Sequence, residues 1–345
     1  VFHLGFIIIL LGAAITRFIG YEGMMHIREK ESSSRIMSDQ TYIQMQAKQG
    51  PETWHKASPV LFFANGKNKF SQTLAIGDEK VKVGLIQYID NAGETVIEDP
   101  NGSPVITLIT INQGDRETRF LQPGESLTSG SVTFCFQKES EDTAAVRISF
   151  LNNELTFLAP WPVYETNMAT GEADTLEAFT AHPLLTMKLF TCQGISFVVK
   201  SFMEKGSIKL VSAPENSEHK LHNAAIVTLS YKGTEEELVL FGGDGYIGQP
   251  ATTRIEGVEF TLTYGARYIE IPFSLELRDF QLERYPGSMS PSSFASEVTL
   301  FDERHGIREP RRIFMNNVLH YGGFRFYQSS YDQDELGTIL SVNHD

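Results

Sequence analysis

The chain has 345 residues, of which 41% are hydrophobic, and its formal net charge is −14. This length is enough for one large domain or two ordinary domains. The negative charge argues against a nucleic-acid-binding protein, because phosphate backbones bind clustered Lys and Arg. Cys135 and Cys192 are too few for a disulfide framework and lack CxxC or zinc-site spacing, so whether they pair stays open.

The chain begins with an apolar segment, residues 1–15, in which His3 is the only ionisable residue. At 1.5 Å per residue this segment is too short for a bilayer core of about 30 Å, so we predict the last part of a transmembrane helix, residues 1–19. A signal peptide and a buried core helix are the alternatives, but neither a basic start nor a cleavage site is evident. A histidine in a membrane is either a functional group, such as a metal ligand, or is hydrogen-bonded to a neighbouring helix.

Residues 20–58 are polar and mixed, and they are predicted to form an amphipathic, partly helical connector. From residue 60 onward, short stretches of alternating apolar and polar residues are separated by Gly, Asn and Asp, which is typical of β-strands. The predicted fold is therefore mainly β, with antiparallel, sandwich-like domains outside the membrane. The predicted strands are residues 60–63, 81–89, 105–111, 131–136, 145–150, 195–202, 225–231, 236–241, 258–264, 268–271, 273–282, 297–301, 312–316, 323–328 and 338–342.

The strand pattern lapses between residues 159 and 190, where a short helix interrupted at Pro183 is expected over residues 175–190. A boundary in this region divides the β part into a first subdomain, residues 59–165, and a second, residues 166–345. Lys232-Gly233 is predicted to be the turn of a hairpin.

Residues 243–248 match the GxGxxG pattern, but a strand-like sequence follows instead of a helix that would receive a pyrophosphate, so a loop is expected. His219 and His222 have the spacing to chelate a metal from one helical face, yet no third ligand is near and a solvated pair is the simpler interpretation. The sequence contains no nucleophile elbow, Walker loop or HExxH motif. We therefore assign no catalytic residue.

Two groups of charged residues occur near the C-terminus. The basic group consists of Arg304, Arg308, Arg311 and Arg312. It could dock an acidic group or a haem propionate, or form an exposed loop with satisfied charges. The acidic group consists of Asp332, Asp334 and Glu335, which lack EF-hand spacing and are expected in a solvated loop.

Two long runs in the C-terminal quarter carry a family resemblance. The first comprises IPFSLELRDF at residues 271–280, ERYPGS at 283–288 and SFASEV at 293–298, and the second is NVLHYGGFRFYQSSY at 317–331. Both resemble the ResB (CcsB) family of cytochrome c biogenesis proteins, and long runs are more specific than a short motif. Residues 2–29 are similar to the family's last helix before its extracytoplasmic domain, in the subgroup often fused to a CcsA half. Residues 40–250 match only as a generic β domain.

The family signature falls on residues for which a structural role is expected: Asp279, Phe280, Tyr285, Pro286, Gly287, Asn317, Tyr321, Gly323, Gln328, Ser329 and Tyr331. The resemblance implies a protein of the bacterial cytoplasmic membrane whose β domain lies on the extracytoplasmic side, with another transmembrane helix after Asp345. It also implies that the protein acts with CcsA (ResC), fused to it or separate, to carry haem across the membrane and attach it to apocytochrome c.

The catalytic half of such a holocytochrome c synthase is expected to be CcsA, because its Trp-rich motif is absent here, where the only tryptophans are Trp54 and Trp161. Without a redox Cys pair in the chain, a thioredoxin-like thiol reductase is expected as a further partner. By the same resemblance His3 is expected to be an axial ligand of haem iron, for which a neutral imidazole is suited. Whether His26 or the arginine group also contacts haem stays open.

A second class of function stays open. A membrane-anchored envelope protein with β-sandwich domains could bind carbohydrate or peptide, and His3 would then be structural. A hydrolase is a weaker interpretation because the sequence shows no catalytic constellation, although triads can assemble from distant residues.

Overall fold

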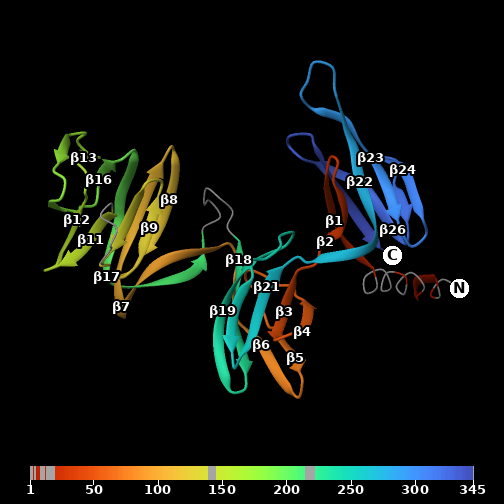
Figure 1. The fold of residues 1–345 in the computed structure, drawn as a ribbon, viewed down its shortest axis with the longest axis horizontal. Helices are drawn as coiled ribbons and strands as arrows, with labels where there is room; N and C mark the ends of the chain where they lie inside the picture. Colours follow the sequence, from red (N-terminus) through yellow and green to blue (C-terminus); the bar gives the residue numbers. More distant parts are fainter. Residues whose placement is uncertain are drawn as a thin grey trace. The chain divides into compact units, whose positions relative to one another are not determined.

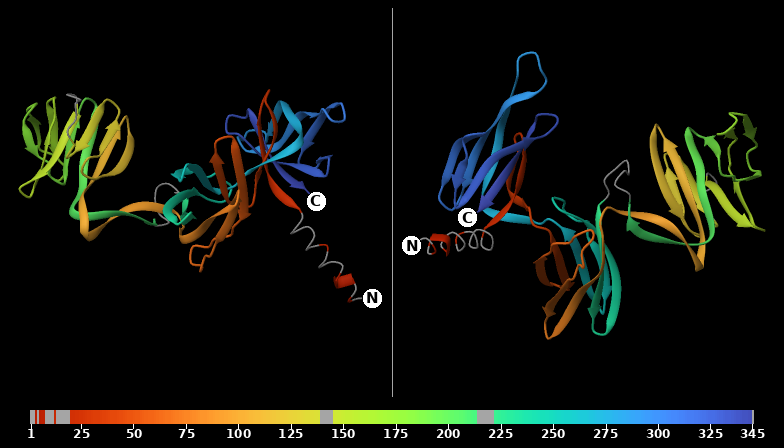
Figure 2. Two further views of the ribbon diagram at one scale, coloured as in Figure 1. Left: turned by 60° about the horizontal axis from the view of Figure 1, so that its bottom comes forward. Right: turned by 180° about the vertical axis from the view of Figure 1, so that it is seen from behind.

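The computed structural model describes residues 3, 5–7, 12, 20–138, 145–213 and 222–344 (Figure 1). Most of these residues lie in strands, which confirms the predicted mainly β class. Figure 2 shows the strands in two further views. Contacts divide the chain into two compact units, residues 1–92 with 214–345, and residues 93–213. All strand pairs but one that the register defines are antiparallel, the exception being β10 with β11.

The first unit contains an eight-stranded sheet in which the two N-terminal strands lie between strands from the C-terminal part. Its order is β24 (Ile307–Phe314), β23 (Pro291–Asp302), β22 (Tyr268–Arg284), β2 (Ser32–Ser38), β1 (Tyr21–Arg28), β27 (Gly337–His344), β26 (Phe324–Tyr331) and β25 (Leu319–Tyr321). Strand β1 pairs with β27 over eight positions, from Tyr21 opposite His344 to Arg28 opposite Gly337. The N-terminal strands are therefore an internal part of this sheet.

The core of this sheet follows from the alternation of each strand, because successive side chains point to opposite faces. On β1 the buried residues are Met25 and Ile27, and on β27 they are Leu340 and Val342. Strand β22 continues through Pro272, which joins the two predicted strands 268–271 and 273–282 into one. These apolar residues form one cluster with Phe326 and Leu300.

Two four-stranded sheets in the first unit share a second core. One has the order β20 (Ala251–Ile255), β21 (Val258–Gly265), β3 (Tyr42–Gln49), β4 (Glu52–Pro59), and the other β19 (Thr234–Gly242), β18 (Asn223–Tyr231), β6 (Glu79–Ile89), β5 (Ser71–Ile76). The predicted hairpin at Lys232-Gly233 joins β18 to β19, with Tyr231 opposite Thr234. Positive φ values of 50° and 85° at its two central residues fit a primed turn, which suits the twist of the strands.

The second unit has two sheets around a third core. The first has the order β14 (Ala173–Leu176), β13 (Val163–Asn167), β16 (Lys188–Cys192), β17 (Ile195–Ser212), β7 (Ala92–Asn112), β8 (Asp115–Leu121); the second is β15 (Ala181–Pro183), β12 (Glu154–Leu158), β11 (Ala145–Leu151), β10 (Val132–Phe136), β9 (Ser126–Ser129). Four buried phenylalanines meet in this core, namely Phe134, Phe157, Phe190 and Phe197.

Several expectations differ from the structure. Residues 20–58 form strands β1 to β4 instead of an amphipathic connector, because alternate residues of this polar stretch, such as Ile43, Met45 and Ala47, are buried in a core. Residues 175–190 form β15 and parts of β14 and β16 instead of a helix. The predicted strand at residues 60–63 is a loop. The contact boundaries at 92/93 and 213/214 differ from the predicted boundary at 165/166, because strands distant in sequence pair with one another.

Replacing Phe197 with alanine is expected to lower the unfolding free energy of the second unit by about 3–5 kcal/mol, because a large cavity opens in a packed core. Phe197 is fully buried, and its ring centroid lies 5.0 Å from that of Phe134 and 5.3 Å from that of Phe190. The measurement is urea unfolding followed by Trp161, which packs on this core, in a Trp54→Phe background.

The matched control is Phe179→Ala, since the Phe179 side chain is 70% exposed and its loss is expected to change the unfolding free energy by less than about 0.5 kcal/mol. Equal urea midpoints for the two variants would contradict the assignment of Phe197 to the core.

Candidate functional site

A groove on the eight-stranded sheet has a volume of about 870 Å³ and lies between β2, β22 and the turn from β23 to β24. Its apolar lining comes from Ile271, Pro272, Phe273, Phe301 and Ile307. Its charged lining comes from Lys30, Glu276, Asp302, Glu303, Arg304 and Arg308. The groove thus combines an apolar surface with charges of both signs.

Asp302, at the end of β23, is the central carboxylate of this groove, and its side chain is fully buried. Arg304 donates three hydrogen bonds to it, from the backbone N at 3.0 Å, from Nε at 3.1 Å and from Nη2 at 2.7 Å. Nδ1 of His305 lies 3.0 Å from Oδ2, and the Tyr321 hydroxyl donates to the same oxygen at 2.8 Å. Both carboxylate oxygens of Asp302 thus accept several hydrogen bonds, and these bonds hold the Arg304 guanidinium beside the groove.

The hydrogen bond from Arg304 lowers the pKa of Asp302 well below its usual range, and this effect outweighs burial, which acts in the opposite direction. The hydrogen bonds from His305 and Tyr321 lower it further. Asp302 therefore stays ionised at any physiological pH. It acts as a fixed anion that orients Arg304 and the ring of Tyr321, which in turn packs edge-on against Phe273 with centroids 4.9 Å apart.

The four predicted arginines do not act as one cluster. Arg304 and Arg308 line the groove, and the Arg308 guanidinium lies 5.1 Å from the centroid of Phe301. Arg311 pairs with Glu309, and Arg312 pairs with Glu297 at 3.3 Å. Only the first two arginines are therefore placed to meet a ligand in the groove.

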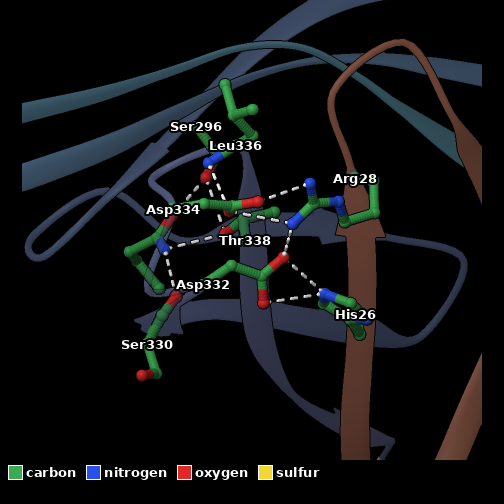
Figure 3. Close-up of polar contacts among 9 residues, drawn as sticks. His26, Arg28, Ser296, Ser330, Asp332, Asp334, Leu336 and Thr338 are labelled. Atoms are coloured by element: carbon green, nitrogen blue, oxygen red, sulfur yellow. Dashed lines mark hydrogen bonds and ion pairs between the residues drawn. The ribbon is translucent and has the colours of Figure 1, made fainter.

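A second polar cluster links β1 to the turn between β26 and β27 (Figure 3). Nε2 of His26 lies 2.9 and 3.0 Å from the two carboxylate oxygens of Asp332. Arg28 donates to Asp332 at 2.7 Å and to both oxygens of Asp334 at 2.9 and 2.7 Å. Glu335 pairs with Arg284 of β22. The acidic residues expected in a solvated loop are thus ion-paired across the sheet.

Burial by itself raises the pKa of Asp332, but the hydrogen bonds from His26 and Arg28 outweigh it, so that the pKa lies below its usual value. The hydrogen bond from Arg28 likewise lowers the pKa of Asp334, and these two carboxylates raise the pKa of Arg28. Gly337 faces Arg28 in the register, and a Cβ there would collide with the Asp332 carboxylate. The cluster is a set of fixed charges that holds β1 against the C-terminal hairpin.

The aromatic residues of the family signature pack within this sheet. Phe280 stacks on Tyr331 with ring centroids 5.4 Å apart, and Phe294 contacts both rings. The Tyr321 hydroxyl donates to Asp302. Tyr285 is exposed and opens the turn from β22 to β23, where Gly287 has a φ of 77° that a residue with a side chain rarely adopts.

The polar residues of the signature lie at turns and in a buried network. The Ser296 hydroxyl lies 2.6 Å from Oε1 of Gln328 and 2.8 Å from Oγ1 of Thr338, and Gln328 Nε2 donates to the same threonine oxygen at 2.8 Å. Ser329 lies at an irregularity of the β26–β27 pairing. Of the remaining signature residues, Asp279 is exposed on β22, and Pro286 and Gly323 lie in turns. Asn317 closes the turn after β24 by a backbone hydrogen bond to Phe314.

His3 is described and its side chain is exposed, but most of residues 1–19 lie outside the described residues. In the part of the chain that the structure describes, no helix has the length and apolar character needed to cross a membrane. His219 lies outside the described residues, and the ring of His222 stacks on Tyr246 with centroids 4.0 Å apart.

The loop at residues 243–248 is followed by β20 and not by a helix, which confirms the loop interpretation. Its glycines allow close backbone packing, since a Cβ at Gly248 would collide with the carbonyl oxygen of Tyr264. Cys135 and Cys192 are free and buried. Sequence reasoning missed Asp302, although an Asp at the end of an apolar strand followed by a turn is a recognisable signal.

Substituting Asp302 with asparagine is expected to lower the thermal unfolding temperature at pH 7, because an amide cannot accept the full set of charge-assisted bonds. The stabilisation by Asp302 is present above the pKa of an unfolded Asp, about 3.9, and is lost as the pH falls towards the lower pKa of the folded state. The difference between wild type and Asp302→Asn should therefore narrow from pH 7 to pH 3 in calorimetry.

Asp279→Asn is the control, because Asp279 is exposed and its carboxylate receives a hydrogen bond from Gln281. It should unfold like the wild type at both pH values. A difference for Asp302→Asn that stayed constant or grew on acidification would contradict the lowered pKa.

Residues 238–344 match the sequence model of the ResB-like family. The match runs from within β19 to the end of β27. It contains Asp302, the acidic residues Asp332, Asp334 and Glu335 of the second polar cluster, and every signature residue. Over 344 residues, all of this chain, the sequence is 25% identical to protein NrfI of Wolinella succinogenes. The chain spans 24% of the length of that relative.

Proposed function

From the match of residues 238–344 to the ResB-like family, we propose that this chain is the extracytoplasmic domain and membrane anchor of a cytochrome c biogenesis protein of the ResB/CcsB kind. The observation that carries the proposal is that the matched residues include most strands of the eight-stranded sheet, where they contact one another. The signature residues Phe280, Tyr321, Gln328 and Tyr331 all contribute to the packing or hydrogen bonding of the eight-stranded sheet.

The proposed site of action is the bacterial cytoplasmic membrane, with the β domain on the extracytoplasmic side. The sheet is suited to follow one membrane span and precede another. Tyr21 pairs with His344, and their rings stack with centroids 4.8 Å apart, so the segments before and after the sheet leave it at one point. The residues that precede Tyr21 supply the proposed anchor.

Haem is the proposed cofactor, held with a CcsA (ResC) partner that is fused or separate. The imidazole of His3 would hold the haem iron, since nitrogen coordinates iron strongly and the ring can stay neutral in lipid. The iron would supply the binding chemistry, and a further histidine ligand is assigned to the partner. Arg304, which is bonded to Asp302, and Arg308 line the groove, and we propose that they receive a carboxylate there.

The acceptor is proposed to be apocytochrome c, whose cysteines must be reduced before haem is attached. The cysteines of this chain are unsuited to that reduction, because both are buried and burial raises the pKa of Cys192 to about 11. The proposal therefore includes a separate thioredoxin-like reductase. It assigns the attachment chemistry to the CcsA half.

The test is the absorption spectrum of the full-length, detergent-purified protein with its CcsA half. His3→Ala and His3→Gly are each expected to lose most of the bound haem, because one axial ligand is removed, and added imidazole should restore the spectrum by filling the vacated position.

His320→Ala is the control, since this histidine is exposed on β25 and is expected to leave the haem spectrum unchanged. Unchanged haem content in both His3 variants would refute the role of His3. A wild-type protein without haem would refute the haem-handling function itself.

A further inference from the structure

The loop between β4 and β5 exposes two large apolar side chains in one short segment. Leu61 is 69% exposed and Phe63 is 58% exposed. Phe62, between them, points inward, where its ring centroid lies 5.2 Å from that of Tyr88 and 5.7 Å from that of Tyr264. The alternation leaves Leu61 and Phe63 on the outer side.

Hydrogen bonds within the loop hold this conformation. The Asn68 side chain bonds the backbone of Phe63 twice, accepting from its N at 3.0 Å and donating to its O at 2.9 Å. Gly66 N donates to the same carbonyl oxygen at 3.1 Å. The exposed apolar pair is therefore presented by a fixed turn, and burying it against a partner needs little further ordering of the backbone.

The charge of the loop differs from that of the whole chain. Residues 59–70 contain no acidic residue, whereas the chain has a net charge of −14. Lys67 and Lys69 are both exposed. Apolar residues flanked by lysines are the composition of segments that lie in the membrane interface, since lysine stems follow apolar surface while their ammonium groups reach water or headgroups.

Backbone hydrogen bonds connect the loop to the start of β1. Val60 N donates to Thr41 O at 2.9 Å, and Asp39 N donates to Glu22 O at 3.0 Å. Leu61 lines a pocket of about 430 Å³ together with Asp39 and Thr41. The loop is thus joined through a few residues to Glu22, which follows closely on the apolar N-terminal segment.

We propose that residues 60–69 form a second membrane contact, in which Leu61 and Phe63 enter the interfacial layer of the bilayer beside the anchor. The lipid bilayer is the chosen occupant because the loop is apolar and basic and is linked to the segment assigned to the membrane. The apolar pair carries the contact, since the acidic chain as a whole is not attracted to anionic lipid. This inference rests on the proposed function, which supplies the anchor.

The experiment uses the full-length protein in phosphatidylcholine vesicles with brominated acyl chains, which quench tryptophan in contact with lipid. Phe63→Trp is introduced in a Trp54→Phe, Trp161→Phe background, and its emission is expected to fall at least twofold relative to vesicles without bromine. Phe6→Trp reports on the anchor, as Phe6 lies in the apolar segment. Met289→Trp is expected to stay unquenched, because Met289 is exposed in the turn after Arg284, at the opposite end of β22 from Tyr268 and its partner Met37.

Quenching of Trp at positions 6 and 63, with none at position 289, supports the membrane contact. Quenching at position 6 alone overturns the loop contact and leaves the anchor in place. Absence of quenching at both positions refutes the anchor and the proposed function with it. If position 63 became shielded only on addition of the CcsA half, the loop would be a protein-docking surface, and the lipid proposal would be wrong.

Discussion

Strands β1 and β2 lie between β22 and β27, and their pairing holds the eight-stranded sheet together. Eight residue pairs join β1 to β27, and β2 pairs with β22, so the C-terminal strands form a continuous sheet only when the N-terminal strands are present. Met25 and Ile27 complete the same core as Leu340 and Val342. The sheet therefore couples the segment that precedes it to the chain's C-terminal end.

Charged groups reinforce this pairing where the apolar core cannot reach. The cluster of His26, Arg28 and Asp332 joins β1 to the turn that precedes β27, and the Asp302 cluster fixes the turn from β23 to β24. In both, a carboxylate accepts several charge-assisted bonds, which offsets the loss of its hydration. These contacts give two residues of the family signature a structural role. Tyr321 completes the Asp302 cluster, and Gln328 forms hydrogen bonds with the buried hydroxyls of Ser296 and Thr338.

The proposed role divides the molecule into parts with different chemistry. The apolar N-terminal segment contains His3, the groove presents the guanidinium groups of Arg304 and Arg308 beside apolar side chains, and the cysteines of the second unit are free and buried. The proposed function uses this division to position a cofactor and an acceptor for a partner protein. The loop that carries Leu61 and Phe63 would set how such a domain rests on the bilayer.

The mainly β class, most of the strands, the hairpin at Lys232-Gly233 and the family resemblance can all be predicted from the amino-acid sequence, because alternation, turn residues and long motif runs are local signals. It did not show that residues 20–58 are strands, since their period-2 pattern is diluted by polar residues and becomes evident only beside β22, β27 and β21. Nor did it join Asp302 to Tyr321 or His26 to Asp332. Those contacts connect residues 19 and 306 positions apart, so only strand pairing in the tertiary structure decides them.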